Sequence, residues 1–337
     1  MKGKIKIFFP LILSLILITT SFSGCSKSSD TKLTKVKLNE VVRSVFYAPM
    51  YAAINQGFFK EEGLDIDLST GQGADKTAQD VLSGNADIGF CGPEQVIYIY
   101  NQKRDNYPIL FAKLTQTDGS FLVGRKSESN FDWSSLKGKT IIGGRPGGVP
   151  EMALEYVLKS KGLKNGQNIN LVTNIAFTAT AGAFKGGTGD YVALFEPTAS
   201  MLVKDKAGSI VASIGKSIGT LPYTCFFSTK TYLEKNKNIL EKFTRAIYKG
   251  QQWVDKSSDE TVATSIKSFF PGTDVSILAQ TTKNYREIHA FALTPLIQEG
   301  DMTRLMDIIQ SYQASLIKER PAFKAIVNTE IAKKVTK

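Results

Sequence analysis

The sequence has few of the side chains that build metal and redox sites. Its 337 residues include three cysteines, two tryptophans and one histidine. It contains no Cys-x-x-Cys and no histidine pair, which excludes the usual zinc and haem ligand patterns. Three cysteines are also too few for a disulfide framework. We expect no metal and no cofactor. Cys91 and Cys225 should be single buried thiols, unless the fold brings them together to pair.

Catalytic motifs are missing as well. There is no Gly-x-Ser-x-Gly elbow of a hydrolase. The glycine-rich run over residues 143–148 lacks the Gly-Lys-Ser/Thr ending with which a phosphate loop holds phosphate and magnesium. His289 falls in a segment that we expect to be helical, where it is typical of a structural or surface side chain. We therefore predict no catalytic residues and a protein that is not an enzyme.

Dense blocks of one charge are also lacking. The chain has 42 Lys and Arg against 31 Asp and Glu, a formal net charge of +11, with the lysines spread along its length. Without a basic block beside aromatic residues, nucleic acid is not an expected partner. The charge suits a solvated surface that tolerates anionic envelope polymers. It does not identify a ligand.

An apolar run stands near the beginning of the chain. Basic residues precede the segment 7–18, which is apolar except for Pro10 and Ser14, and small residues follow it. This pattern is typical of a secretion signal, and the run is shorter than the ~20 residues of a transmembrane helix. No later segment is apolar enough to span a bilayer. We predict that residues 1–24 are a signal peptide and that the rest is exported.

Cys25 resembles the modified cysteine of bacterial lipoproteins, because the small residue Gly24 precedes it and a polar stretch follows. Phe22 departs from the leucine that is usual in that family at the third position before the cysteine. The alternative is an ordinary cleavage site with a spare thiol. We predict lipidation at Cys25, which would anchor the exported protein to the cell membrane. Residues 25–35 would then form a flexible polar tether.

Beyond this tether, short apolar runs alternate with helical periods, which is typical of the α/β fold class. We expect strands at 36–42, 64–68, 88–90, 109–111, 121–124, 139–142, 169–173, 191–195 and 223–227. We expect helices at 51–59, 75–82, 94–100, 150–161, 238–253 and 305–316. Strand–helix–strand units of this length predict parallel pairing with right-handed crossovers.

Two extended stretches divide the chain into lobes. We interpret residues 120–125 and 223–229 as two hinge strands. Lobe 1 then comprises 36–119 and the helical C-terminal part 230–337, whereas lobe 2 comprises 126–222. Two such lobes leave a cleft at the carboxyl ends of their strands, where open α/β sheets bind ligands.

Several strand-to-helix junctions carry residues that suit a cleft rim. Aromatic rings beside a helix start can stack on a flat ligand, although core packing is the alternative. Glycine turns before helices permit close backbone approach, although simple turn geometry would also explain them. The candidates of these two kinds are Phe46, Tyr47, Gly71, Gln72, Gly73, Gly147 and Gly148.

Polar candidates come from the same junctions. Glu196 could accept from an amine or a ring N–H, or it could cap the next helix. Arg145 could pair with a ligand anion or with a protein carboxylate. The further candidates at these junctions and at the second hinge are Cys91, Glu94, Phe195 and Tyr223.

At these junctions the sequence resembles a known family. The motifs that carry the resemblance occupy residues 47–51, 55–66, 82–89, 136–147 and 195–197. They resemble ABC-transporter substrate-binding proteins of the branch that takes nitrate, sulfonates, taurine and thiamine pyrimidine precursors. The resemblance extends over about residues 36–227, and the helical remainder fits a return to the first lobe.

The resemblance implies a two-lobed periplasmic-binding fold, type II-like, that closes on a small ligand and presents it to a membrane permease. It implies a monomer held near its permease by the lipid. One alternative is a lipid-anchored sensor or adhesin with the same fold. Another is an enzyme like the family's eukaryotic pyrimidine synthases, which rely on a histidine. Here the matching window holds Phe46 and Tyr47 instead.

Two ligand classes stay open. Nitrate or a sulfonate would need hydroxyls and backbone amides, which Ser69, Thr70, Gly147 and Gly148 could supply. A flat heterocycle would need aromatic walls and a carboxylate, which Tyr47, Phe195, Tyr223 and Glu196 could supply. We favour the heterocycle, because aromatic and acidic residues outnumber hydroxyls at these junctions.

Overall fold

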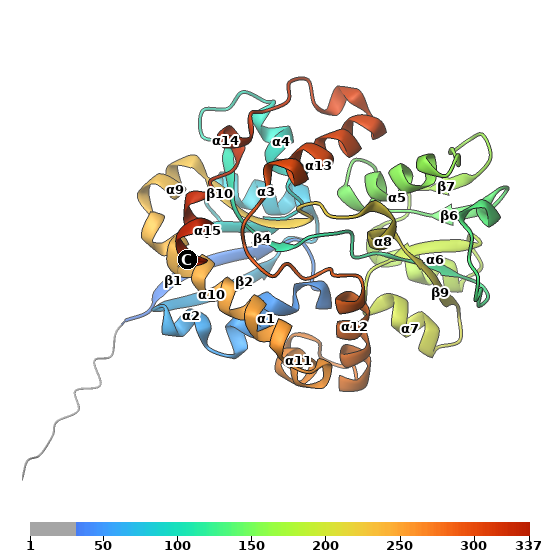
Figure 1. Cartoon of the computed structure of the whole chain (residues 1–337), viewed down its shortest axis with the longest axis horizontal. Helices are drawn as coiled ribbons and strands as arrows, with labels where there is room; N and C mark the ends of the chain where they lie inside the picture. Colours follow the sequence, from blue (N-terminus) through green and yellow to red (C-terminus); the bar gives the residue numbers. More distant parts are fainter. Residues whose placement is uncertain (1–31) are drawn as a thin grey trace, which may run out of the picture. The chain divides into compact units, whose positions relative to one another are not determined.

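Two five-stranded sheets form the framework of the protein (Figure 1). The computed structural model describes residues 32–337, of which 33–337 form one compact unit. The predicted signal peptide and Cys25 lie outside the described residues. The first sheet has the order β2-β1-β3-β10-β4 and the second the order β7-β6-β8-β5-β9. Each sheet with its helices makes one lobe.

The first sheet contains β1 (Thr34–Glu40), β2 (Leu64–Thr70), β3 (Ile88–Cys91), β4 (Pro108–Thr115) and β10 (Thr224–Thr229). The helices before β10 are η1 (Val45–Tyr47), α1 (Ala48–Asn55), α2 (Phe58–Glu61), α3 (Ala74–Ser83) and α4 (Glu94–Tyr100). Those after β10 are α9 (Lys230–Lys235), α10 (Lys237–Lys256), α11 (Asp259–Ile266), η4 (Lys267–Phe269), α12 (Val275–Glu287), α13 (Glu299–Tyr312), η5 (Ala314–Leu316), α14 (Phe323–Ile326) and α15 (Glu330–Val335).

The second sheet contains β5 (Phe121–Gly124), β6 (Thr140–Ile142), β7 (Asn170–Val172), β8 (Tyr191–Leu194) and β9 (Ser209–Ser213). Its helices are η2 (Trp133–Leu136), α5 (Val149–Ser160), η3 (Phe177–Ala179), α6 (Thr180–Lys185), α7 (Thr198–Lys204) and α8 (Ile214–Ile218). In Figure 1 these green and yellow elements gather apart from the blue, orange and red elements of the first sheet.

The expectation of parallel pairing is correct for only part of each sheet. β1 runs parallel to β2 and β3, and β6 runs parallel to β7 and β8. β10 is antiparallel to β3 and β4, and β5 is antiparallel to β8 and β9. The exceptions are the strands nearest the crossings between lobes. Because these strands enter from the other lobe rather than through a covering helix, the crossover rule does not set their direction.

The two predicted hinge strands belong to different sheets, β5 to the second and β10 to the first. The segments that cross between the lobes lie just outside them, before β5 and after α8. The Leu221 amide donates to the Gln116 carbonyl at 3.1 Å, and the Thr117 hydroxyl donates to the Gly219 carbonyl at 2.8 Å. The two crossings are therefore tied to each other by hydrogen bonds.

β10 anchors the core of the first lobe. All of its residues are buried, which agrees with a central strand covered on both faces. Phe226 stacks on Phe90 of β3 with ring centroids 4.4 Å apart and meets Phe243 of α10 at 5.1 Å. The helix α10 crosses α1 closely at Gly250, where an added Cβ would lie 2.3 Å from the Pro49 carbonyl oxygen.

Two helix predictions need correction. The segment 51–59 is not one helix, because Gly57 adopts φ +80° and separates α1 from α2. The helix expected to contain His289 ends at Glu287, and His289 itself is exposed with φ +53°. A left-handed residue at this point stops the helix. The expectation of a surface or structural histidine agrees with this placement.

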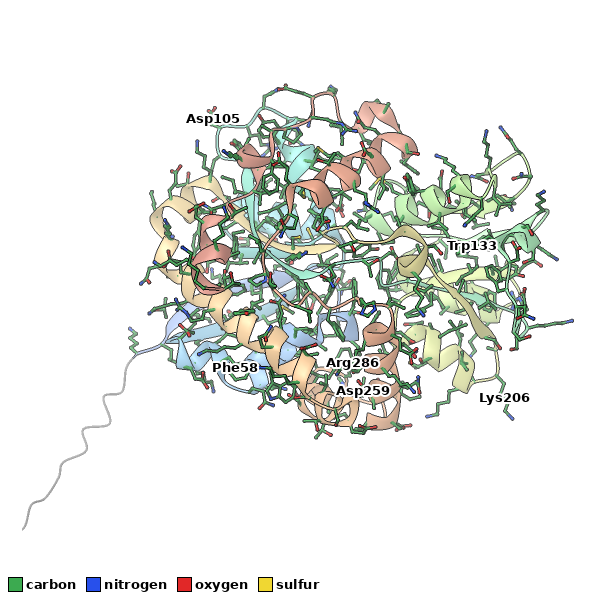
Figure 2. The ribbon with its side chains drawn as sticks, in the orientation of Figure 1. Phe58, Asp105, Trp133, Lys206, Asp259 and Arg286 are labelled. Carbon is green, nitrogen blue, oxygen red and sulfur yellow. The ribbon has the colours of Figure 1, made fainter. Side chains whose placement is uncertain are left out.

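Arg286, labelled in Figure 2, joins three C-terminal helices. Its Nε lies 3.0 Å from Asp259 Oδ1 in α11, and its Nη2 donates to the Val254 and Ser257 carbonyls at the end of α10. The C-terminal helices thus form a cross-linked support for the first lobe. Within residues 32–337, none of the helices combines the length and the apolar character needed to cross a bilayer.

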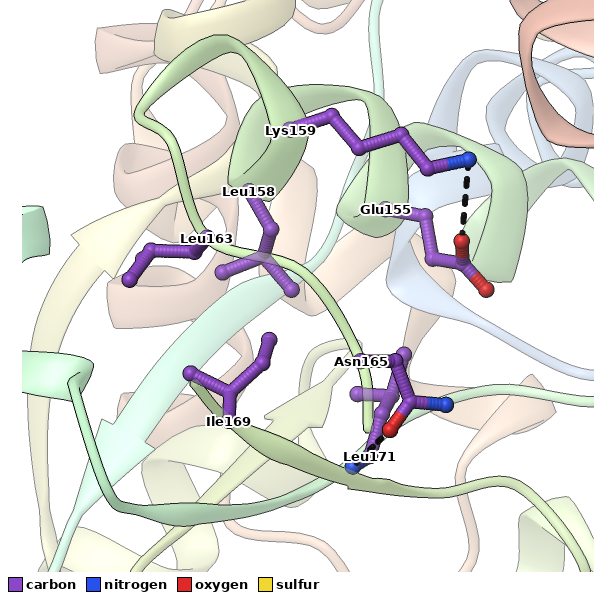
Figure 3. Close-up of a pocket in the computed structure, with 7 residues that line it drawn as sticks. All are labelled: Glu155, Leu158, Lys159, Leu163, Asn165, Ile169 and Leu171. Carbon is purple, nitrogen blue, oxygen red and sulfur yellow. Dashed lines mark hydrogen bonds and ion pairs between the residues drawn. The ribbon is translucent and has the colours of Figure 1, made fainter. Parts of the chain in front are cut away.

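A small cavity lies in the second lobe between α5 and the segment that leads into β7 (Figure 3). It measures about 10 Å³, close to the minimum that holds one water molecule. Leu158 and Ile169 line it, and Asn165 Oδ1 accepts from the Leu171 amide at 2.8 Å. Its size makes it a packing defect rather than a ligand site.

Candidate functional site

An aromatic cluster lies where the two lobes meet. Phe46 of η1, in the first lobe, has its ring centroid 5.7 Å from that of Phe195, which follows β8 in the second lobe. Tyr223, at the end of a crossing segment, lies 5.6 Å from Phe46 and 6.2 Å from Phe195. The ring of Tyr47 lies 5.7 Å from that of Phe46. Both lobes and the hinge therefore contribute to one cluster, which we call the aromatic cluster (Phe46, Tyr47, Phe195 and Tyr223).

Local backbone features hold these rings in place. Ser44 caps η1, because its Oγ accepts from the Phe46 amide at 3.2 Å. Gly119 lies in the first crossing segment, and a Cβ there would come within 2.9 Å of the Phe46 ring and 3.0 Å of the Phe195 ring. Only a residue without a side chain lets the crossing pass this close to both rings.

Glu94 is a buried carboxylate beside the cluster. It follows β3 in the first turn of α4 and is 1% exposed. Its Oε1 accepts from the Gln95 side chain at 3.2 Å, whereas its Oε2 has no hydrogen-bond partner among the described residues. Burial raises the pKa of Glu94 to about 7. A Cβ at Gly92 would lie 2.0 Å from Glu94 Oε2, so only a glycine at this position leaves room for the carboxylate.

Asp118 is a second buried carboxylate, and it was not predicted from the sequence. It lies in the first crossing segment and is fully buried. Its Oδ1 accepts from the Ser120 amide at 2.7 Å, and the carboxylate also accepts from the Tyr223 hydroxyl. Burial raises the pKa of Asp118 to about 6.

Besides burial, the carboxylates of Asp118 and Glu94 both raise the pKa of the Tyr223 phenol. The hydroxyl of Tyr223 is buried and donates a hydrogen bond to the Asp118 carboxylate. Burial raises its pKa well above the ordinary value, and the charges of Asp118 and Glu94 raise it further. Glu94 also adds to the raised pKa of Tyr47, again after burial. Glu94 Oε2, by contrast, has no hydrogen-bond donor among the described residues.

Glu151 occupies a corresponding position in the second lobe. It stands in the first turn of α5, after β6, and is fully buried. Its Oε2 accepts from the Gly144 amide at 2.6 Å, and its Oε1 has no partner among the described residues. Burial raises its pKa to about 7. This residue too was not among the sequence candidates.

Glu196 differs from the other acids because protein donors satisfy its carboxylate. Its Oε2 accepts from the Ser200 amide at 2.8 Å, and its Oε1 accepts from the Ser200 hydroxyl at 2.8 Å. Asn284 of α12, in the first lobe, also donates to Oε1 at 2.6 Å. The side chain therefore caps α7, the alternative left open by the sequence, and joins the lobes.

The backbone of Glu196 joins the lobes as well. The Ser44 hydroxyl donates to its carbonyl at 3.1 Å, and its amide donates to the phenolic oxygen of Tyr285 at 2.9 Å. We call Glu196 with Ser44, Asn284 and Tyr285 the interlobe clamp. It holds together the rim next to Phe195.

The first glycine turn uses its amides internally. Gly71 donates to the Glu40 carbonyl at 2.8 Å and Gly73 to the Val41 carbonyl at 3.1 Å, with Gln72 at φ +59° between them. Gly71 also borders an open surface depression of about 580 Å³, whose other lining residues are Thr70, Asp75, Lys76, Gln79 and Asp80. Of the three predicted residues in this turn, Gly71 therefore borders the depression.

The second glycine turn touches the opposite lobe. The Gly147 carbonyl accepts from the Tyr98 hydroxyl of α4 at 3.2 Å, and the Gly148 amide donates to the Arg145 carbonyl at 3.1 Å. The Arg145 guanidinium pairs with Asp75 of α3 at 3.4 Å while both side chains are about half exposed. The sequence analysis left two partners open for Arg145, a ligand anion or a protein carboxylate, and Asp75 is such a carboxylate.

Cys91 and Cys225 are free and fully buried, and they face each other as register partners on β3 and β10. Burial raises both pKa values, so neither thiol is a ready nucleophile. Within residues 32–337 there is no group of three or more His, Cys, Asp or Glu side chains that could hold a metal ion.

The fold is shared with solved binding proteins, which likewise have two α/β lobes. The alkanesulfonate-binding protein SsuA from Xanthomonas axonopodis pv. citri, in a structure with bound MOPS, has this fold. Its TM-score is 0.70 at 13% identity, and the match covers 88% of this chain and 99% of that chain.

Sequence comparison gives the family. The NMT1/THI5-like family model matches residues 45–261. YtlA of Bacillus subtilis (strain 168), whose name describes a binding protein, is 43% identical over 336 residues, 100% of this chain and 99% of YtlA. The chain belongs to the NMT1/THI5-like family.

More distant relatives are of two kinds. The formylaminopyrimidine-binding protein of Halalkalibacterium halodurans is 23% identical over 74% of this chain and 76% of its own length. The 4-amino-5-hydroxymethyl-2-methylpyrimidine phosphate synthase of Aspergillus parasiticus is 24% identical over 62% of this chain and 63% of its own length. The relatives of this chain thus include one named as a binding protein and one named as a synthase.

Proposed function

We propose that this protein is the extracytoplasmic solute-binding receptor of an ABC importer. It captures a small organic ligand between its lobes by hinge closure and delivers the ligand to a membrane permease. The observation that carries this proposal is the aromatic cluster, to which both lobes and a crossing segment contribute and whose Tyr223 is affected by the buried carboxylates of Asp118 and Glu94. A ligand that contacts both lobes stabilises the closed state by its differential affinity, and no bond needs to break.

Membrane attachment is the second part of the proposal. Lipidation of Cys25 would tether the exported chain as a monomer near its permease, and the usual diacyl modification gives stable anchoring where a single chain does not. The lipoprotein-like sequence around Cys25 supports it. In the native host, Cys25→Ser should release the protein into the soluble fraction and abolish incorporation of a labelled fatty acid. Retention in the membrane with full labelling would contradict this part.

The proposed ligand is a flat heterocycle, such as a thiamine pyrimidine precursor, in preference to a sulfonate or nitrate. Aromatic walls and hydrogen-bond acceptors suit ring N–H groups, whereas an anion would face buried carboxylates. The similarity to a formylaminopyrimidine-binding protein also supports a heterocyclic ligand. Glu94 takes the role that the sequence suggested for Glu196, because Ser200 and Asn284 already satisfy Glu196.

Binding is favoured over synthase activity by the position of the histidine. His289 is exposed beyond the end of α12 and lies outside the aromatic cluster. In the window where the resemblance to the synthases would require a histidine, the chain has Phe46 and Tyr47. The cluster therefore lacks the side chain on which such a synthase relies.

Thermal unfolding of the purified protein against a ligand panel tests this function. The panel contains a thiamine pyrimidine precursor, riboflavin, taurine, an alkanesulfonate and nitrate. A ligand at 100 times its Kd adds about 2.7 kcal/mol, which raises the Tm by several degrees. A shift with a ring compound alone supports the proposal. A shift with a sulfonate keeps the receptor function and overturns the ligand preference, and no shift with any compound argues for a sensor or adhesin.

A further inference from the structure

Lysines gather at the end of the first lobe where the chain enters the compact unit. β1 begins at Thr34, whose amide donates to the Gly63 carbonyl at 2.9 Å, and a Cβ on Gly63 would lie 3.9 Å from Lys242 Nζ. The helix α10, which carries Lys242, packs against β2, α2, α9 and α15, and Figure 1 shows these elements grouped with β1 and the C-terminus. We call the exposed and half-buried lysines of this group the entry face: Lys35, Lys37, Lys60, Lys235, Lys237, Lys242, Lys333, Lys334 and Lys337.

The entry face carries more positive charge than its own acids neutralise. Three of its lysines are in ion pairs, Lys35 with Asp67, Lys333 with Glu330 and Lys334 with Glu241. The other six have no ion-pair partner within residues 32–337. In the same part of the chain, the acids of β1, β2, α2, α9 and α15 that lack a partner are Asp65 and Glu234. Together with the C-terminal carboxylate they leave an excess of lysines open to an external anion.

The covalent chain brings a bilayer next to this face. Nine residues lead from Cys25 to Thr34, and they span at most about 30 Å. A compact unit of this size is about 50 Å across, so a lipid on Cys25 holds the entry face nearer to the bilayer than the opposite side of the unit. Because such a tether keeps the two surfaces at a high effective concentration, a weak attraction between them is sufficient for contact.

The interlobe site lies at the other end of the same strands. β1 and β2 are parallel, and both begin at the entry face, with Thr34 opposite Leu64. β1 ends at Glu40, four residues before Ser44, which caps η1 beside the aromatic cluster. When the entry face lies on a bilayer, the carboxyl ends of these strands and the aromatic cluster therefore point away from it.

We propose that the entry face lies against an anionic lipid bilayer, with its lysines at the phosphate headgroups, and that this contact turns the interlobe site of the anchored receptor toward the solvent. The inference rests on the proposed lipidation of Cys25 and adds a contact surface and an orientation to it. Each lysine near an anionic bilayer favours contact about fivefold, and salt screens this attraction. A soluble anionic polymer offers the same phosphates, but no covalent bond holds it beside Thr34.

The test attaches the mature chain, from Cys25 onward, to vesicles through the thiol of this residue. Cys91 and Cys225 are free but fully buried, so a maleimide lipid should couple at Cys25. The compact unit, with both sheets, lies wholly within this mature chain. The vesicles consist of phosphatidylcholine with or without phosphatidylglycerol. The acylation rate of each lysine is measured with an amine-reactive reagent and mass spectrometry.

We expect the lysines of the entry face to react about fivefold more slowly on the anionic vesicles, and this protection to disappear in about 1 M NaCl. Lys137, Lys139 and Lys164 are the internal control. They belong to the second lobe, they are exposed, and they have no ion-pair partner within residues 32–337. They should react at the same rate on both kinds of vesicle.

Two matched triple variants locate the contact. Lys60→Gln, Lys235→Gln and Lys237→Gln together remove three unpaired charges from the entry face, and they should abolish the protection of the remaining Lys242. Lys137→Gln, Lys139→Gln and Lys164→Gln together remove as many charges from the second lobe, and they should leave the protection of Lys242 unchanged. Circular dichroism establishes that both variants are folded.

The outcomes separate this inference from the function on which it rests. Equal acylation of the entry face on both kinds of vesicle, equal protection of the second-lobe lysines, or full protection of Lys242 in the entry-face variant overturns the bilayer contact. Stronger protection by soluble polyphosphate than by the vesicles assigns the face to a polymer and overturns it as well. The ligand panel tests the receptor function without a membrane, and Cys25→Ser in the host tests lipidation, so each can fail or hold independently of this result.

Discussion

The backbone amide of Glu196 donates to the phenolic oxygen of Tyr285 at 2.9 Å, across the boundary between the lobes. The same tyrosine packs against the aromatic cluster, with its ring centroid 4.9 Å from that of Phe46. One residue therefore touches both the clamp and the site. Loss of the Tyr285 hydroxyl should therefore affect both the closure of the lobes and the free energy of unfolding.

Tyr285→Phe should destabilise the protein and favour opening. The Glu196 amide would lose its acceptor in a buried place, which costs about 1–3 kcal/mol. We expect a lower free energy of unfolding in urea and a larger radius of gyration in solution. Tyr191→Phe is the control, since Tyr191 donates to Glu128 at 2.7 Å within the second lobe, and it should leave the radius unchanged. Equal radii for both variants would contradict an interlobe role.

Gly250→Ala should destabilise the protein by about 1–3 kcal/mol, because overpacking forces shifts in well-packed elements. Its Cβ would meet the Pro49 carbonyl oxygen at 2.3 Å and the Ala53 Cβ at 2.9 Å, so α1 and α10 would have to separate. Gly182→Ala in α6 meets nothing within 4 Å and should be neutral or slightly stabilising. Denaturant titration of the two variants measures this difference. Equal unfolding midpoints for Gly250→Ala and Gly182→Ala would contradict the close crossing of α1 and α10.

The free energy of unfolding should fall as the pH rises from 5 to 8. Burial raises the pKa of Glu40, Glu94 and Glu151 from 4.5 to about 7, and that of Asp118 from 3.8 to about 6. Because these values lie above those of the unfolded chain, the folded state binds more protons in this window and its stability is lost as they leave.

The measurement is the Tm of the ligand-free protein from pH 5 to 8, where we expect a decrease of several degrees. Glu94→Gln should flatten part of this decrease, because one of the raised pKa values is removed. A Tm that is constant or rises with pH would show that these acids are ionised and compensated in the folded protein.

The thiols of Cys91 and Cys225 should be unreactive in the folded protein. Both are fully buried and free, and burial raises their pKa values, so thiolate formation and access are both restricted. In a Cys25→Ser variant, a thiol reagent such as DTNB should label neither cysteine without denaturant and both in guanidinium chloride. Fast labelling under native conditions would show that β3 and β10 separate readily.

The sequence was informative where periodicity and composition decide the structure. The helix over Glu94–Tyr100 was predicted with its bounds, and β5 appeared at residues 121–124 as expected. β9 (Ser209–Ser213) was missed, because all of its residues are only partly buried and the segment lacks a clear alternation. The direction of β10 could not be predicted, since strand pairing across an inserted lobe leaves no local pattern.

The site was predictable only in part. Aromatic residues at strand ends led to Phe46, Tyr47 and Tyr223, which the fold brings together. Asp118 was missed, because the local sequence around a buried acid has the same pattern as that around an exposed one. Its place between the apolar stretch of β4 and that of β5 was the available signal.

The position of β10 between β3 and β4 has a consequence for folding during synthesis and export. Every strand of the second sheet lies within residues 121–213, so that sheet can assemble as soon as this segment is available. The first sheet stays divided until residues 224–229 arrive to fill its centre. Since distant pairings close slowly, the middle of the chain should fold first and the two ends should join around it.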